Sequence, residues 1–396
     1  MNGHVAVVDL GYGDAGKGTV VEALCADAPV RAVLRFNGGA QAAHNVVTPS
    51  GRHHTFAQFG SGTLRGMPTH LTRFMVVDPL ALAAEAVALG DPYELLTVEG
   101  DALLATPWHR AANRRRETAS GDARHGSCGM GVGETMAYAL AHTEAPRVAD
   151  VLSPARLRRR LTALADFYGP GFVVDDVVDA FVAFGQTVRI VDESYTGRLL
   201  NEGPCVFEGA QGVLLDEWRG WHPHTTWSTT TFDNALSLCP SLRRLGVVRT
   251  YTTRHGAGPF VTEDATLRLP EPHNGTGEWQ GAFRAGHFDA VAHRYAVEVA
   301  GGVDGLAVTH LDVPPRCPEL RVCTSYEGGW SRIVPGKFRD LDHQAALTER
   351  LFRARPGELF RPDDWPSAIG ELLDAPVVLE SYGPAAADKK LHLGRM

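Results

Sequence analysis

Short apolar runs alternate with amphipathic segments along most of the chain. Segments with helical spacing of apolar residues occupy 20–28, 78–90, 155–168, 174–185, 288–300 and 366–374. Strand-length apolar runs lie between them, at 5–10, 30–36, 73–78, 204–209, 245–253, 304–312, 320–326 and 375–382. Continuous apolar runs are typical of strands buried on both faces. The pattern therefore predicts an α/β fold with a mostly parallel central sheet and helices on both faces.

The domain organisation follows from the same pattern. No internal repeat, low-complexity block or linker interrupts it, so we expect a single domain over residues 1–396. Two stretches lack strand or helix patterning and are expected to be loop excursions. They are an arginine-rich stretch near 109–135 and a stretch near 254–287 that is rich in proline and glycine.

Charge and composition exclude several classes of function. The chain has 38 Lys and Arg against 46 Asp and Glu, so no global positive field is available for nucleic acid or an anionic membrane surface. No apolar run approaches the roughly 20 residues of a membrane span, and the N-terminal sequence lacks signal-peptide features, so a cytoplasmic location is expected. The six cysteines form no CxxC pair, which argues against a zinc ribbon.

The first candidate for chemistry follows the first predicted strand. The sequence GYGDAGKGT at 11–19 fits the pattern G-x-x-x-x-G-K between a strand and a helix, where backbone amides and Lys17 can hold phosphate. An ordinary phosphate loop carries Ser or Thr at the position of Gly18. Asp14 places a carboxylate inside the loop instead, and a carboxylate can bind a hard cation or act as a base. A ligand-free glycine turn is the alternative.

Four further polar segments end predicted strands or follow them. They bring one notable residue each: His44, Gln211, Arg254 and Asp312. A lone histidine is more often structural than catalytic, so His44 alone decides nothing. Strand ends at the carboxyl edge are where α/β sheets bind ligands. The tetrapeptide THLD that contains Asp312 is similar to the guanine-reading element of GTP-binding proteins.

Taken together and in this order, the segments resemble adenylosuccinate synthetase. The resemblance runs from VVDLGYGDAGKGT through RFNGGAQAAHNVV, FEGAQGVLLD, YTTRHGAGPF and THLD to SYGP. It implies a P-loop-NTPase-like α/β fold, a homodimer, and a Mg²⁺-dependent reaction with GTP as co-substrate. In that family, GTP phosphorylates O6 of the nucleotide IMP, and the amino group of aspartate then displaces the phosphate.

The resemblance assigns roles residue by residue. Asp14 falls on the base and Mg²⁺ ligand, His44 on the general acid, Gln211 on the residue that positions the 6-oxygen, and Ala43 on a second Mg²⁺ ligand through its carbonyl. The GTP site would comprise Gly13, Ala15, Gly16, Lys17, Gly18, His310, Asp312, Ser381 and Gly383. Lys17 is also expected to act in catalysis.

The acceptor and amine-donor sites depart from the family pattern. The expected acceptor contacts are Gln41, Ser127, Cys128, Gln211, Thr226, Arg254 and His255; Gln41 replaces an asparagine and His255 a small apolar residue. The loop that clamps the two carboxylates of aspartate with several arginines keeps only one of them here. Its residues are Thr276, Glu278, Gln280 and Arg284. A dianion is a poor match for such a loop.

Three interpretations remain open. The chain is an ordinary adenylosuccinate synthetase in which other arginines, including those at 114–116, replace the clamp. Alternatively, it keeps the phosphoryl-transfer half and uses another acceptor, another amine donor or both. A non-catalytic GTP-binding or interaction protein is the third. The presence of Asp14, Lys17, His44 and Gln211 argues against the third, and the altered donor loop favours the second.

Overall fold

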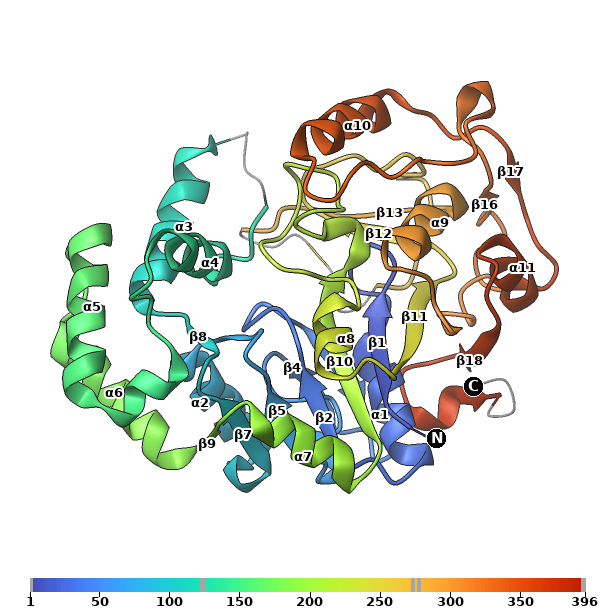
Figure 1. Ribbon diagram of the computed structural model, residues 1–396. Helices are drawn as coiled ribbons and strands as arrows, with labels where there is room; N and C mark the ends of the chain where they lie inside the picture. The colour runs from blue at the N-terminus through green and yellow to red at the C-terminus, as the bar shows by residue number, and fades with distance from the viewer. Residues whose placement is uncertain (1–2, 122–125, 272–274, 276–278, 393–396) are drawn as a thin grey trace.

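A ten-stranded sheet forms the centre of the computed structural model, which describes residues 3–121, 126–271, 275 and 279–392 (Figure 1). Every neighbouring pair in it is parallel except β18 with β19 at one edge of the sheet. The order across the sheet is β19 (Lys389–Leu391), β18 (Val377–Ser381), β15 (Gly305–Thr309), β11 (Arg243–Arg249), β1 (Val5–Asp9), β10 (Cys205–Gly212), β2 (Ala32–Arg35), β5 (Thr69–Leu71), β7 (Leu96–Glu99) and β9 (Arg189–Val191). The predicted α/β class with a mostly parallel sheet is confirmed.

The central strand β1 is buried on both faces, as its continuous apolar sequence predicts. Val5 and Val7 contribute to one core with helix α1 (Lys17–Asp27). Ala6 and Val8 contribute to a second core with helix α9 (Ala290–Val299). Successive side chains of a strand point to opposite faces, so one run feeds both cores and helices cover both faces.

A third core lies beneath β5 and β7. It joins these strands to α2 (Pro79–Leu89), α4 (Val132–Ala141), α5 (Pro154–Tyr168) and α6 (Val174–Thr187), which stand at the left of Figure 1. Further helices are α3, described below, α7 (Ser194–Glu202), α8 (Asp233–Leu238), α10 (Leu341–Arg353) and α11 (Trp365–Leu372). The single-domain organisation stays a prediction.

Two predicted strands of the central sheet were wrong. The run 73–78 supplies only β6 (Val76–Val77), which pairs with β8 (Leu103–Leu104) outside the main sheet. β5 lies in the central sheet instead. The sequence of β5 is not an apolar run because it contains the polar residues Thr69 and His70, which are fully buried and hydrogen-bonded. The run 320–326 supplies β16 (Val322–Cys323), which lies between β14 (Phe288–Asp289) and β17 (Leu359–Phe360).

The predicted loop near 109–135 was also wrong, because most of its described part is helical. Helix α3 (Pro107–Ala119) begins at a Thr106 cap, and α4 follows from Val132. Trp108 and Ala112 of α3 are buried. The sequence pattern did not indicate this helix because arginines dominate its exposed face. The stretch 254–287 contains a two-stranded hairpin of β12 (Thr252–His255) and β13 (Phe283–Gly286).

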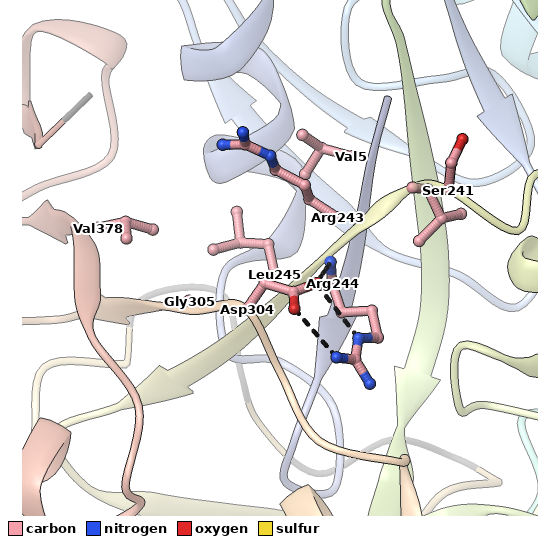
Figure 2. A pocket seen from close by; sticks show the side chains of 9 residues that line it. Val5, Ser241, Arg243, Arg244, Leu245, Asp304, Gly305 and Val378 are labelled. Atoms are coloured by element: carbon pink, nitrogen blue, oxygen red, sulfur yellow. Dashed lines mark hydrogen bonds and ion pairs between the residues drawn. The ribbon is translucent and has the colours of Figure 1, made fainter. Parts of the chain in front are cut away.

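The residues singled out from the sequence gather at one edge of the sheet. Asp9, Gly212, Arg249, Thr309 and Ser381 each end a parallel strand, and these carboxyl ends meet there. The opposite edge holds a cavity of about 340 Å³, whose wall includes the Arg244–Asp304 ion pair (Figure 2). None of the predicted site residues lines that cavity. Within the described part of the chain, no helix is long and apolar enough to cross a membrane.

Candidate active site

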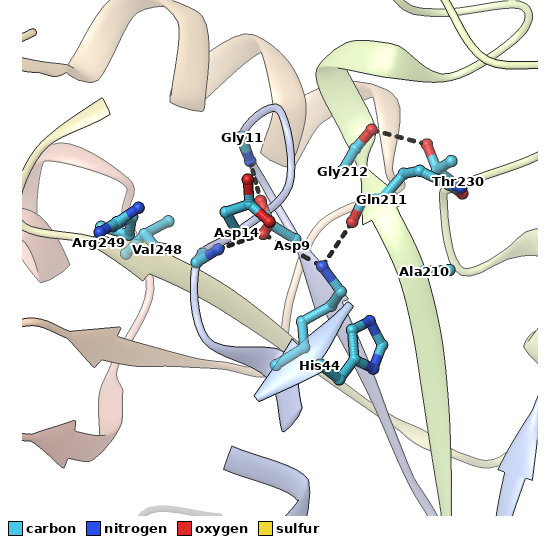
Figure 3. Close-up of polar contacts among 12 residues, drawn as sticks. Asp9, Gly11, Asp14, His44, Ala210, Gln211, Gly212, Thr230, Val248 and Arg249 are labelled. Carbon is cyan, nitrogen blue, oxygen red and sulfur yellow. Dashed lines mark hydrogen bonds and ion pairs between the residues drawn. The ribbon is translucent and has the colours of Figure 1, made fainter. Parts of the chain in front are cut away.

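The carboxylate of Asp9 holds the predicted phosphate loop in place. Its oxygens accept hydrogen bonds from the amides of Gly11 and Ala15, both at 2.8 Å, and lie 3.3 Å from Lys17 Nζ (Figure 3). Lys17 also donates to the carbonyl of Gln211 at 2.7 Å. The buried lysine thereby ties the loop to the end of β10, and its charge is placed beside the loop.

The start of α1 suits an anion. Gly16 caps the helix in the left-handed conformation with φ of 89°, no side chain caps the first turn, and that turn contains no acidic residue. The amides of a free helix N-terminus carry partial positive charge and point outward. The predicted phosphate contacts, Gly13, Ala15, Gly16, Lys17 and Gly18, all lie in this loop and first turn.

Asp14 stands at the tip of the loop in an unusual conformation. Its φ is 60°, a left-handed value that costs energy for residues other than glycine. Its Oδ2 lies 3.3 Å from Nε2 of His255. Burial raises the pKa of the Asp14 carboxyl, but the contact with His255 and the charges of Lys17 and Arg249 outweigh it and leave the pKa below its ordinary value. The carboxylate is therefore ionised near neutral pH.

His44 is held by a buried carboxylate. Nδ1 of His44, the first residue of β3 (His44–Val47), lies 2.6 Å from Oε1 of Glu208, and the amide and hydroxyl of Ser61 also donate to Glu208. Burial would raise the pKa of Glu208, but His44, the Arg35 guanidinium and Ser61 lower it to about 2. An ionised Glu208 fixes the imidazole orientation and leaves Nε2 for a ligand.

Two glutamine side chains flank Gly38. A β-carbon on Gly38 would lie 3.3 Å from Nε2 of Gln41 and 3.4 Å from Oε1 of Gln211. Both atoms are buried, and neither has a hydrogen-bond partner among the described residues; the same holds for Oε1 of Gln41. Buried polar atoms are normally satisfied, so this pair points to a polar ligand between them.

The predicted guanine element lies beside the predicted phosphate loop. The Thr309 hydroxyl donates to the carbonyl of Ala15 at 2.8 Å, and His310 follows with φ of 57°. Burial holds the pKa of His310 well below its ordinary value, so its ring is neutral. The Asp312 carboxylate contacts the exposed Arg316 at 3.5 Å. Leu311 bonds to Ser381, whose hydroxyl donates to the carbonyl of Gly383 at 3.2 Å.

The predicted acceptor loop is packed between two tryptophans. A β-carbon on Gly129 would lie 3.0 Å from the ring of Trp279, and one on Gly133 3.1 Å from the ring of Trp227. Ser127 is hydrogen-bonded to Asn113 of α3. Burial raises the pKa of Cys128 to about 11, so its thiol is protonated. Thr226 lies beside Trp227 and bonds through its amide to Leu215.

The side chain of Arg254 is held by contacts within the protein. Its three guanidinium nitrogens donate to the carbonyls of Ala257, Pro259 and His224, and it lies over the ring of Tyr12. Burial lowers its pKa to about 10. Three of the five guanidinium N–H groups are thus already used, which leaves two for a phosphate or carboxylate.

Arg284 is committed as well. It pairs with Arg254 across the β12–β13 hairpin, and its guanidinium binds Glu263 Oε2 at 2.8 Å and the carbonyl of Gly258 at 2.9 Å. Gln280 lies near the acceptor loop, since a β-carbon on Gly126 would approach its carbonyl at 3.0 Å. Thr276 and Glu278 lie outside the described residues.

Several site residues escaped sequence reasoning. Asp9 and Glu208 stand inside strands that were interpreted only as core, and Ser61 lies outside every quoted segment. An acidic residue in an otherwise apolar strand was the available signal for Asp9 and Glu208, because burying a charge requires partners. Arg249, which is buried and bonded to Tyr251 and Glu271, also ends a strand at this edge.

The residues fit a magnesium ion that is held mainly by a nucleotide. Mg²⁺ prefers oxygen ligands and usually takes one or two from the protein. The Asp14 carboxylate and the carbonyl of Ala43 are such donors. No group of three or more potential ligating side chains occurs among the described residues, so a ready-made cage is absent from that part of the chain.

Comparison with known proteins decides the family. The family model described as adenylosuccinate synthetase matches residues 6–352. The chain belongs to the adenylosuccinate synthetase family. It is thus a GTP-dependent ligase that forms a C–N bond. It is 32% identical to the adenylosuccinate synthetase of Synechococcus sp. (strain WH7803), covering 96% of this chain and 94% of that protein.

Other relatives agree. The adenylosuccinate synthetase of Acidithiobacillus ferrooxidans is 34% identical over 99% of both chains. The fold resembles that of fully ligated Plasmodium falciparum adenylosuccinate synthetase, with a TM-score of 0.82 and 21% identity over 98% of this chain and 100% of that one. A cyanophage S-2L succinoaminodeoxyadenylate synthetase bound to dGMP and dATP has a TM-score of 0.66 and 19% identity, over 99% and 96%. These two likenesses bear on the fold alone.

Proposed function

We propose that the protein uses GTP and Mg²⁺ to phosphorylate an oxo group of an IMP-like nucleotide and then replaces the phosphate with an amine other than aspartate. The observation that carries this proposal is the state of Arg284. It is the one arginine left in the donor loop, and it is already paired with Glu263. That pairing supports an altered donor.

The charge balance supports a donor with fewer negative charges. Each charge-assisted hydrogen bond to a carboxylate is worth about 1.5–3 kcal/mol, so a dicarboxylate needs several cationic partners. Three of the five N–H groups of Arg254 donate to carbonyls, and Arg284 already forms an ion pair with Glu263. An amine with one carboxylate or none avoids an unpaired charge in this site.

The chain's own residues have distinct tasks in phosphoryl transfer. Asp14 takes the proton from the ring nitrogen beside the oxo group, and that oxygen attacks the γ-phosphorus of GTP while the bond to the bridging oxygen of GDP breaks. Lys17 and the first amides of α1 hold the phosphates, and His44 stabilises the transferring group. Gln211 positions the oxo group. Mg²⁺, held by Asp14 and the Ala43 carbonyl, would neutralise charge on the phosphate oxygens.

Ordinary adenylosuccinate synthesis from IMP, aspartate and GTP is the second candidate. The identity of 32–34% to proteins of that name, over nearly their whole length, favours it. In that case arginines of α3 such as Arg114, which lies over the ring of Trp279, would have to supply the missing clamp. The homodimer and the cytoplasmic location stay predictions under either candidate.

Product analysis separates the candidates. Purified protein is incubated with GTP, Mg²⁺ and IMP, with aspartate, with a panel of monocarboxylate and neutral amines, or with no amine, and products are read by mass spectrometry. We expect GDP and phosphate release without adenylosuccinate when aspartate is the only amine. Adenylosuccinate formed at an ordinary rate would overturn the altered-donor proposal and support the second candidate.

A further inference from the structure

His255 lies against the predicted phosphate loop. It is the last residue of β12 and pairs with Phe283 of β13, and the two rings contact edge to face with centroids 5.0 Å apart. The amide of Gly256 donates to the carbonyl of Ala282 at 3.0 Å, which closes this end of the hairpin. The imidazole is therefore fixed by its backbone and by its neighbour.

The contact of His255 is with the predicted base. Nε2 lies 3.3 Å from Oδ2 of Asp14, while the Asp14 side chain keeps 35% of its surface exposed. Asp14 sits in a loop rather than in a helix or strand and has a left-handed φ. A short side chain on such a loop has few contacts of its own, so its contact with the paired strands β12 and β13 can decide where the carboxylate points.

We propose that His255 is a positioning residue that fixes the Asp14 carboxylate for catalysis. The proposal rests on the function proposed above. The imidazole donates its Nε2 hydrogen to Oδ2, which leaves Oδ1 directed to the acceptor. His255 neither gains nor loses a proton in the step. The adenylosuccinate synthetase resemblance places a small apolar residue at this position, so the contact belongs to this chain.

A merely structural contact predicts something else. If His255 only pinned the hairpin to the phosphate loop, its loss would lower the melting temperature and weaken GTP binding together. A positioning residue instead affects the step in which Asp14 acts, because GTP contacts come from Lys17 and the first turn of α1. The two roles therefore separate in a comparison of kcat with KM.

The test uses three variants of the full chain. His255→Val removes the donor, and His255→Gln retains one. The matched control is His287→Val, which breaks another histidine–aspartate pair of similar length, 3.4 Å to Asp264, just after β13. Each variant is assayed for phosphate release with GTP, Mg²⁺ and IMP, and for its melting temperature with and without GTP and Mg²⁺.

We expect His255→Val to lower kcat by about tenfold to a hundredfold with KM for GTP and the GTP-induced melting shift unchanged. His255→Gln recovers most of the loss, and His287→Val leaves kcat unchanged. An unchanged kcat in His255→Val overturns the proposal. The proposal is also overturned if His255→Gln loses as much kcat as His255→Val and the GTP-induced shift in melting temperature is lost as well.

The contact itself is tested without turnover. In protein labelled with ¹⁵N-histidine, the His255 signals are assigned by their absence from His255→Gln. In the wild type the Nε2–H proton of His255 should be hydrogen-bonded and exchange slowly with water, and in Asp14→Ala it should exchange faster. If the wild type releases no phosphate with any acceptor, the proposed function fails. In that case the spectra still test the contact. If the His255 spectrum is identical in wild type and Asp14→Ala, the contact is overturned. If it differs, the contact is retained.

Discussion

Gly18 faces the side chain of His44. A β-carbon added at residue 18 would lie 2.8 Å from Cβ of His44, 3.1 Å from Oγ of Ser61 and 3.2 Å from the carbonyl of Asn45. Real β-carbons do not approach other atoms as closely as 2.8 Å. Serine or threonine, which an ordinary phosphate loop has at this position, cannot be accommodated while His44 keeps its place. The departure in the loop and the candidate acid are therefore one structural feature.

Restoring the ordinary residue should damage the protein. Gly18→Ser must displace β3 or the start of α1, so we expect a loss of about 1–3 kcal/mol in the free energy of unfolding and a large loss of phosphate release. Urea unfolding and a phosphate assay measure the two effects. The control is Gly171→Ser, because nothing lies within 4 Å of a β-carbon there. Full activity in Gly18→Ser would show that His44 moves freely.

Removing the charge of Glu208 should impair His44. Glu208→Gln keeps the size of the side chain but replaces a charge-assisted bond to Nδ1 with a neutral one. We expect kcat to fall by roughly 10²–10⁴-fold, the range for losing an oriented acid or base, with KM for GTP nearly unchanged. Steady-state kinetics checks this. A fall of less than about threefold would mean that Glu208 does not orient a catalytic group.

The same substitution should change how stability depends on pH. The pKa of Glu208 is about 2 in the folded chain, against an ordinary value of 4.5. A carboxyl with a lowered folded pKa contributes stability above its unfolded pKa and loses it as pH falls through the folded value. The stability difference between wild type and Glu208→Gln should be full above pH 4.5 and should shrink toward pH 2. Chemical unfolding across that range measures it, and a constant difference would contradict it.

Asp312 should set the choice of nucleotide base. An aspartate at this position can accept two N–H groups from guanine, and Asp312→Asn loses one acceptor. We expect weaker GTP binding relative to ATP and XTP, measured by competition in a thermal-shift assay. Arg316→Ala is the control, because its exposed ion pair with Asp312 should be worth little. An unchanged base preference in Asp312→Asn would show that the guanine element lies elsewhere.

The sequence predicted strands buried on both faces and failed at strands with polar residues. β1 and β10 are mainly apolar apart from single acidic residues, Asp9 and Glu208, and both were found. β5 was missed because Thr69 and His70 are buried with hydrogen-bond partners that come from distant segments, including Thr97 and Thr196. Partners so far apart in the sequence leave no local pattern.

For the candidate site, too, the sequence predicted some features and missed others. The family resemblance identified the loops of Asp14, His44 and Gln211, because motifs preserve residue type and order. It did not identify what each group contacts. Glu208 beneath His44 and Glu263 beside Arg284 became visible only when the fold brought distant segments together.

Freeing Arg284 should shift the amine donor toward aspartate. Glu263 neutralises Arg284 at 2.8 Å and stands 38% exposed, so Glu263→Ala removes the competing carboxylate without opening the core. One recovered charge-assisted bond is worth about 1.5 kcal/mol, so the ratio of kcat/KM for aspartate to that for a neutral amine should rise about tenfold. Competition between the two amines, read by mass spectrometry, measures this ratio.

A matched control separates a local effect from a change in net charge. Glu298→Ala breaks a similar exposed pair, 3.0 Å from Arg332 and outside the predicted site, and should leave the ratio unchanged. Adding Arg284→Ala to Glu263→Ala should abolish the gain, because the recovered bond requires the guanidinium. A gain that survives in the double variant would mean that aspartate binds without Arg284, and the donor would then be recognised by residues other than the loop's remaining arginine.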